Sequence, residues 1–308
     1  MAFQRQFLLP DGMSVLLIAA GSAFAQPPPS TSPSPATFHE RVEDVARALQ
    51  NNPRFKNLSE EQRLNRVEFV IGNTLFALLH EIGHVAINEL TLPVLGREED
   101  EADAYAILRM LRIVGTGFSQ RALAEAAKNW FLNARRDQEI GATAVYYGEH
   151  TLGQQRAYQV VCLMVGSDPA KFKSLADEFQ MPSERQQTCR RDYGKIARSW
   201  DAVLAPHRRA PDQPQTKIYV AYSEAPENLV GFARAFRRVQ ILETVAQRSA
   251  SDLAWPAPFT LEMRSCGQPE SAWSEENRTV RICYELAFDF AQLYDAYVST
   301  AGSPGSQE

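Results

Sequence analysis

The spacing of apolar residues changes once along the chain, and this change limits the folds open to it. From Phe38 to about Ala205, apolar residues recur every three or four positions, as on the buried faces of helices. A Pro-rich stretch, 206–215, follows. Beyond it apolar residues alternate with polar ones, as in half-buried strands, along 217–222, 259–266 and 279–286.

These segments predict an α+β fold with two halves. The helical half (37–205) is joined by a linker (206–215) to a β-α-β-β-α half (216–300). In the second half we expect one amphipathic helix at 226–249, a hairpin formed by 259–266 and 279–286, and a closing helix at 287–298.

The N-terminus has the features of a secretory signal. An apolar run ends in Ala23-Phe24-Ala25, which matches a signal-peptidase site before Gln26. We expect 1–25 to be the signal peptide and 26–36 a Pro/Ser-rich linker, with 301–308 a disordered tail; the alternative is an uncleaved anchor. No other stretch has the roughly 18 apolar residues that span a bilayer. A secreted or periplasmic protein without a transmembrane span in the mature chain is therefore expected.

The charge balance limits the kinds of partner the chain can bind, and the cysteine count bears on the cellular compartment. The chain has 32 Lys plus Arg against 37 Asp plus Glu, so it offers no basic field for nucleic acid. Its four cysteines are an even number, as expected of an exported protein with disulfides. Cys266 and Cys283 fall at neighbouring ends of the expected hairpin, which favours Cys266–Cys283 and Cys162–Cys189 among the three pairings. The alternative for Cys162 is a buried thiol in an apolar helix.

The segment His80-Glu81-Ile82-Gly83-His84 carries the strongest chemical signal. Its helix is expected to begin at a capping box formed by Ser59 and Gln62 and to run to about residue 90. On a helix His80 and His84 share one face and can bind one metal ion, with Glu81 toward the same edge. Two neutral imidazoles suit zinc, and the carboxylate can take a proton from water. The alternative is that both histidines are merely packed and hydrogen-bonded. The glycine between them would allow a second backbone to approach closely.

A catalytic zinc site needs a third protein ligand. Five of the six residues from Glu98 to Asp103 are acidic, and they open a helix, where carboxylates favour the macrodipole. Glu99 and Asp103 lie one turn apart, so one can bind the metal while the other accepts the free N–H of a ligating histidine. Glu98, Glu101 and His150 are rival ligands.

These motifs resemble those of known zinc peptidases. HEIGH followed by Glu-x-Glu-Ala-Asp resembles the gluzincin class, and HEIGH with LPVLGREEDEAD resembles a bacterial metallopeptidase family still described as a domain of unknown function. The resemblance extends to segments 149–156, 162–169, 266–267 and 283–286. It implies a zincin-like fold in which Glu99 is the third ligand and Asp103 orients a histidine.

The chain departs from that resemblance in two places. The strand unit ending in Cys283-Tyr284-Glu285-Leu286 follows the HExxH helix, whereas the family places it before. We therefore expect a circularly permuted chain whose sheet packs beside that helix and supplies the edge strand for an extended substrate. The second departure is Glu270-Ser271, where the family usually has Asn-Ala, and it leaves the role of that loop open.

The sequence predicts an exported, zinc-dependent metallopeptidase, specifically an endopeptidase, that acts on a peptide or protein substrate. Glu81 would be the general base, and His150 would donate a hydrogen bond to the developing oxyanion. Arg156 would clamp a carboxylate or the substrate. For His150 and Arg156 the alternatives are a surface imidazole and a structural ion pair. For the whole chain, the alternative is a non-catalytic module with a structural metal or a protein-binding role. The oligomeric state is left open.

Overall fold

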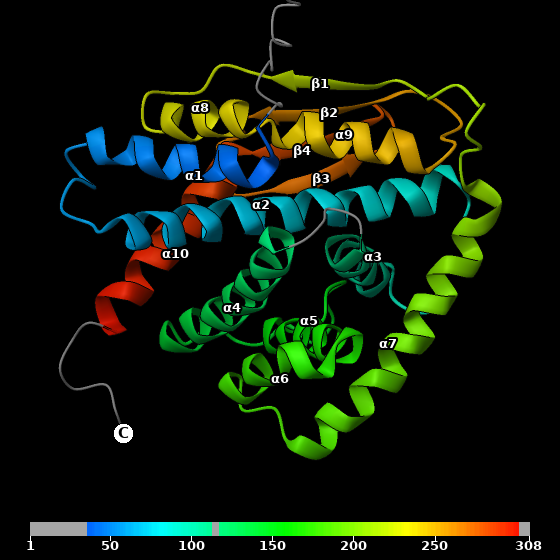
Figure 1. The fold of residues 1–308 in the computed structure, drawn as a ribbon, viewed down its shortest axis with the longest axis horizontal. Helices are drawn as coiled ribbons and strands as arrows, with labels where there is room; N and C mark the ends of the chain where they lie inside the picture. Colours follow the sequence, from blue (N-terminus) through cyan, green and yellow to red (C-terminus); the bar gives the residue numbers. More distant parts are fainter. Residues whose placement is uncertain (1–35, 113–116, 302–308) are drawn as a thin grey trace, which may run out of the picture. The chain divides into compact units, whose positions relative to one another are not determined.

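A 30-residue helix, α2 (Glu60–Glu89), runs between the two parts of the chain and contacts both (Figure 1). Our computed structural model describes residues 36–112 and 117–301, which belong to one compact unit. Helix α2 begins as predicted, because Ser59 and Gln62 exchange the two hydrogen bonds of a capping box, 3.1 and 2.8 Å long. The expected signal peptide (1–25), the linker up to Pro35 and the tail beyond Ala301 lie outside the described residues.

Helices make up the described part of the first half, as its apolar spacing predicted. Helices α3 and α4 pack directly on α2, α5 packs on α4, and α7 packs on α5. Helix α1 lies against α2 and against α8 (Val230–Val239) of the second half. Their bounds are α1 Phe38–Ala48, η1 Leu49–Asn51, α3 Glu98–Arg112, α4 Phe118–Glu139, α5 Gly153–Ser167, α6 Pro169–Glu178, α7 Ser183–Leu204 and η2 Ala205–His207.

The second half forms a four-stranded mixed sheet. Two helices lie between its first and second strands in sequence, and one helix follows its last strand. The strands are β1 (Ile218–Tyr222), β2 (Phe259–Arg264), β3 (Ser271–Ser274) and β4 (Thr279–Cys283), in the spatial order β1-β2-β4-β3. Strands β1, β2 and β4 are parallel, and β3 is antiparallel to β4 at the edge. The α+β class is thus as predicted. Strands β3 and β4 pack against α2.

The alternating pattern in the strands is confirmed, but the expected hairpin is wrong. Phe259, Leu261 and Met263 of β2 are all buried, as are Val280 and Ile282 of β4. These two strands are parallel neighbours, however, because β3 lies between them in sequence and pairs with β4. The expected strand 279–286 also ends early, since α10 (Tyr284–Ala301) begins directly after β4.

The expected single helix 226–249 is two helices. Helix α8 (Val230–Val239) is followed by Gln240, whose φ of 57° is left-handed, and α9 (Ile241–Asp252) begins directly after this residue. A residue in that conformation cannot continue a right-handed helix. The break turns α9 onto the sheet, where it packs against β1 and β2.

Both expected disulfides, Cys162–Cys189 and Cys266–Cys283, are present. The first joins α5 to α7. The second joins the carboxyl ends of β2 and β4, which lie together because these strands are parallel and Arg264 pairs with Cys283. The pair is therefore the predicted one, although the strand arrangement that creates it differs from the hairpin.

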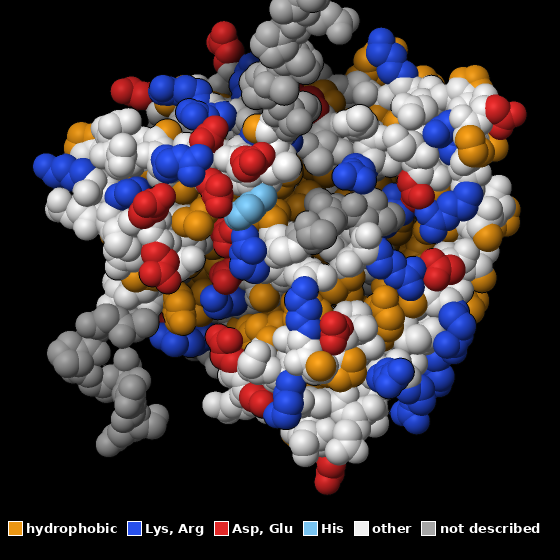
Figure 2. All heavy atoms as spheres, in the orientation of Figure 1, with side chains coloured by type: hydrophobic (Ala, Val, Ile, Leu, Met, Phe, Trp, Pro, Cys, Tyr) orange, Lys and Arg blue, Asp and Glu red, His pale blue; other side chains and the backbone are white. Residues whose placement is uncertain are grey.

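Polar contacts tie the two halves together across α2 and its neighbours. Arg278, next to β4, binds Glu89 at the end of α2, and Arg136 on α4 binds Asp289 on α10. On the face shown in Figure 2, basic and acidic side chains are interspersed. Among the described residues, α2 alone is long and apolar enough to cross a membrane, but 89% of its most apolar window is buried inside the protein.

Candidate metal centre

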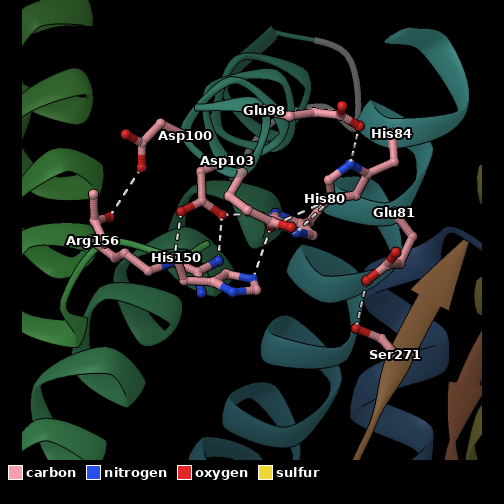
Figure 3. A network of polar contacts seen from close by, with 11 residues as sticks. His80, Glu81, His84, Glu98, Asp100, Asp103, His150, Arg156 and Ser271 are labelled. Atoms are coloured by element: carbon pink, nitrogen blue, oxygen red, sulfur yellow. Dashed lines mark hydrogen bonds and ion pairs between the residues drawn. The ribbon is translucent and has the colours of Figure 1, made fainter. Parts of the chain in front are cut away.

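The side chains of His80 and His84 on α2 lie close together (Figure 3), and the Glu99 carboxylate of α3 contacts both of them. The Nε2 atoms of the two histidines are 3.2 Å apart. Glu99 Oε2 lies 3.1 Å from His80 Nε2 and 3.4 Å from His84 Nε2. Three potential ligand atoms therefore form a nearly equilateral triangle, with both imidazoles presenting the same nitrogen.

Close packing of two helix backbones brings Glu99 to this point. Gly83 lies between the two histidines, and a Cβ atom placed on it would be only 2.9 Å from the Cα of Ala102. Only glycine permits this approach without a shift. Ala102 lies in the first turns of α3, between Glu99 and Asp103, so the contact places both carboxylates beside the histidines. The sequence predicted such an approach at this glycine.

Each histidine has its own carboxylate partner on the other ring nitrogen. His80 Nδ1 is 2.9 Å from Asp103 Oδ1, and His84 Nδ1 is 2.7 Å from Glu98 Oε1. Such contacts fix the ring orientation and direct Nε2 toward a ligand. Asp103, expected to orient a histidine, thus lies at Nδ1 of His80. The contact of Glu98 with His84 was missed, since the sequence suggested Glu98 only as a rival metal ligand.

Asp103 is itself held by Arg156 on α5. The guanidinium donates two hydrogen bonds, of 2.7 and 2.6 Å, to the Asp103 carboxylate, and its plane lies over Trp130. Asp103 is 2% exposed, so this bidentate pair compensates its buried charge. Burial alone would raise the pKa of Asp103, but Arg156 and His80 outweigh burial and lower it. Arg156 thus clamps a carboxylate of the protein itself.

The charges of the site are strongly coupled. Burial would lower the pKa of His80, but the hydrogen bond with Asp103 and the contact with Glu99 outweigh it and raise the pKa to about 9. For Glu99, burial acts to raise the pKa, and the contacts with His150, His80 and His84 reverse this and hold the pKa well below its usual range. At neutral pH and without a metal, cationic imidazole and anionic carboxylate thus stabilise one another.

His150 approaches from the loop between α4 and α5. Its Nε2 lies 2.8 Å from Glu99 Oε2, and its side chain is 49% exposed. Thr151 beside it donates to Asp100 on α3 with a 3.1 Å bond, which anchors the loop. His80, Glu99 and His150 together could hold an ion, since their ligand atoms lie within 4.8 Å of one another. For the remaining rival, Glu101, burial and the neighbouring carboxylate of Asp100 raise the pKa.

Glu81 lies beside the histidines but is directed toward the sheet. The residue is 5% exposed, and its carboxylate Oε1 accepts a 2.7 Å hydrogen bond from the hydroxyl of Ser271 on β3 (Figure 3). Sequence reasoning missed this contact. No local signal could have indicated it, because the two residues are 190 positions apart.

A cleft of about 1190 Å³ opens onto these groups. Helices α2, α4 and α10, the loop before α5, and the edge strand β3 all contribute to its walls. The groups of the candidate metal centre that line it are His80, Glu81, His84, Glu98, Glu99, His150, Arg156 and Ser271. A substrate in this cleft would therefore contact the histidines and the free edge of the sheet together.

The donor set fits a zinc ion. Ligand atoms about 2.1 Å from a tetrahedral zinc are about 3.4 Å apart, close to the 3.1, 3.2 and 3.4 Å observed here. Glu99 Oε2 is also buried without satisfying hydrogen-bond geometry with any described partner. The Nε2 atoms of His80, His84 and His150 surround this oxygen, and a shared metal ion would explain why the ligand atoms gather there.

Comparison with known proteins assigns the chain to a family. The family model DUF4344, described as a putative metallopeptidase, matches residues 39–204, more than half of the chain. The match covers the HExxH helix, both acidic partners, His150 and Arg156. Neither curated proteins nor solved structures give a match. The chain belongs to the DUF4344 family of putative metallopeptidases, which implies a metal cofactor and a peptide or protein substrate.

Proposed function

We propose that the protein is an exported zinc endopeptidase whose ion is held by His80, His84 and Glu99. The observation that carries the proposal is the triangle of Nε2, Nε2 and Oε2 atoms at tetrahedral spacing, with a separate carboxylate on each histidine Nδ1. The two disulfides support export, since such bonds persist in oxidising compartments. The sheet beside α2 supports a zincin-like arrangement with β3 as the edge strand.

Each residue of the site has a role in peptide hydrolysis. Bound zinc supplies Lewis acidity, which activates water and polarises the scissile carbonyl. Glu81 takes the proton of the attacking water and passes it to the leaving amine. His150, which lines the cleft, donates a hydrogen bond to the oxyanion, while Asp103 and Glu98 keep the imidazoles aligned.

The edge of the sheet provides a surface for the substrate backbone. Strand β3 pairs with β4 on one side only, and Ser271, Ala272 and Trp273 line the cleft. An extended peptide can add to such an edge through main-chain hydrogen bonds, with side chains alternating between cleft and solvent. A peptide paired along this edge would extend to both sides of the scissile bond, and this favours cleavage within a chain over removal of a terminal residue.

A second candidate is a non-catalytic module in which His150 closes the coordination shell as a fourth ligand. Its proximity to Glu99 favours this reading. Against it, the 2.8 Å separation of His150 Nε2 from Glu99 Oε2 is a hydrogen-bond distance and is shorter than a tetrahedral ligand spacing of about 3.4 Å. Structural zinc sites also have closed shells, whereas this one faces a large cleft.

The E81Q variant separates the two candidates. We expect the purified wild type to hold about one zinc and to cleave a mixed peptide library in a chelator-sensitive way, and E81Q to keep the zinc but lose cleavage. Mass spectrometry of the products reports internal against terminal cleavage. A wild type that binds zinc but cleaves nothing would favour the module, and an active E81Q would refute the assigned base.

A further inference from the structure

The contact between Ser271 and Glu81 joins the sheet to the HExxH helix at the group that performs proton transfer. The Ser271 hydroxyl donates to Glu81 Oε1 over 2.7 Å. Figure 3 shows the Glu81 carboxylate directed at Ser271, apart from the imidazoles of His80 and His150. Glu81 is nearly buried, so bulk water cannot readily replace this donor.

The backbone that carries Ser271 is held firmly. Ser271 is the first residue of β3 and pairs with Ile282 of β4, while the N–H of Cys283 donates to the carbonyl of Glu270 over 3.0 Å. Both connections fix the start of the strand. The pairing with β4 therefore sets the position of the Ser271 backbone, from which the hydroxyl projects.

The loop leading to β3 is fastened as well. The disulfide Cys266–Cys283 ties its first part to the end of β4. The Glu285 carboxylate accepts hydrogen bonds from the backbone N–H groups of Cys266 and Gly267, 3.0 and 2.9 Å long, and from the hydroxyl of Ser265. The disulfide and Glu285 thus hold the approach to Ser271 from one side, and the β3–β4 ladder holds it from the other.

A general base must present one oxygen to water in a fixed direction. The terminal torsion of a glutamate is soft, so the carboxylate turns freely unless something holds it. A donor on Oε1 removes this freedom and leaves Oε2 for the proton. A charge-assisted hydrogen bond of this kind is stronger than a neutral one. Serine is well suited to holding the carboxylate, because its side chain is short and the backbone that carries it is fixed.

From this geometry we infer that Ser271 is a positioning residue for the base: its hydroxyl locks the Glu81 carboxylate so that Oε2 faces the attacking water. The inference rests on the proposed function. The packing of the sheet on α2 then matters for catalysis in two ways. The sheet orients the Glu81 carboxylate, and it offers an edge strand to the substrate. Ser271 acts through Glu81 and takes no proton itself.

The test compares S271A with S271T and with the matched control S274A. Ser274 lies at the other end of β3, where its hydroxyl interacts with Asn277. We expect S271A to lower kcat on the order of tenfold with KM and zinc content unchanged. S271T keeps a hydroxyl on a β-branched side chain that suits a strand, and it should restore most of kcat. S274A should match the wild type.

A second measurement does not depend on activity. In a double-mutant cycle on urea unfolding of the zinc-free protein, S271A should change the unfolding equilibrium constant by several-fold in the wild type but much less in an E81A background. A rise in KM with kcat unchanged would make Ser271 a substrate contact and overturn the inference. So would additive effects in the cycle. If the wild type shows no metal-dependent hydrolysis at all, the proposed function fails first, and that outcome is distinct from an active enzyme indifferent to S271A.

Discussion

Replacing Gly83 with alanine tests whether the close approach of α3 to α2 builds the metal centre. The added Cβ would lie 2.9 Å from the Ala102 backbone, against about 3.4 Å for ordinary contact, so α3 must move by about 0.5 Å. Glu99 and Asp103 move with it. Metal–ligand distances tolerate about ±0.2 Å, so this shift is large enough to disturb the third ligand.

The magnitudes follow from two opposing effects. Overpacking costs about 1–3 kcal/mol, and alanine recovers about 1 kcal/mol of helix propensity over glycine. We expect G83A to lower the free energy of unfolding of the zinc-free protein by about 0–2 kcal/mol. Zinc affinity should fall by about 10- to 100-fold, the range seen when groups around a metal are disturbed. Urea unfolding and competition with a chromophoric chelator measure the two quantities.

G72A is the matched control on the same helix. Its Cβ would also lie 2.9 Å from a backbone atom, the Cα of Ala122 on α4, a helix with no expected ligand. G72A should lose similar stability and keep wild-type zinc affinity. The reasoning is refuted if G83A binds zinc as tightly as G72A and the wild type do.

Three further predictions concern the groups around the ion. H150A should keep its zinc, by metal analysis, and lose about 10²–10³-fold in kcat on a peptide substrate; loss of zinc would instead make His150 a ligand. D103N and E98Q should each weaken zinc binding about 10- to 100-fold in a chelator competition, and wild-type affinity in both would contradict their orienting roles. Zinc binding at pH 7 should release a proton from His80. Burial lowers the pKa of this imidazole, but its contacts with Asp103 and Glu99 raise the pKa to about 9, and only neutral imidazole binds zinc. Calorimetry in buffers of different ionisation enthalpy measures this release, which should disappear well above pH 9 if His80 is its source.

The helical part was predictable because its signals are local. Ser59 and Gln62 mark the start of α2 within four residues of sequence, and the spacing of His80 and His84 follows from the helix repeat. The glycine between the histidines indicated a close backbone approach, and the structure shows Ala102 there. Such features depend on neighbours within one or two turns, so the sequence alone contains them.

The sheet was less predictable because pairing depends on distant residues. Alternation identified β2 and β4 but could not distinguish a hairpin from two parallel neighbours, since both bury the same side chains. Strand β3 has only four residues, all half-buried, and shows no clear alternation. The contact of Ser271 with Glu81 and the pairing of Glu98 with His84 follow from tertiary packing, so neither could be read from spacing.

The most direct test of the proposed metal centre is the crystal structure of the zinc-loaded protein. The proposal predicts one zinc ion bound by Nε2 of His80, Nε2 of His84 and a Glu99 oxygen, each at about 2.0–2.2 Å, with a fourth position open to the cleft. An ion bound by His150 in place of Glu99, or a fully closed shell of four protein ligands, would contradict it.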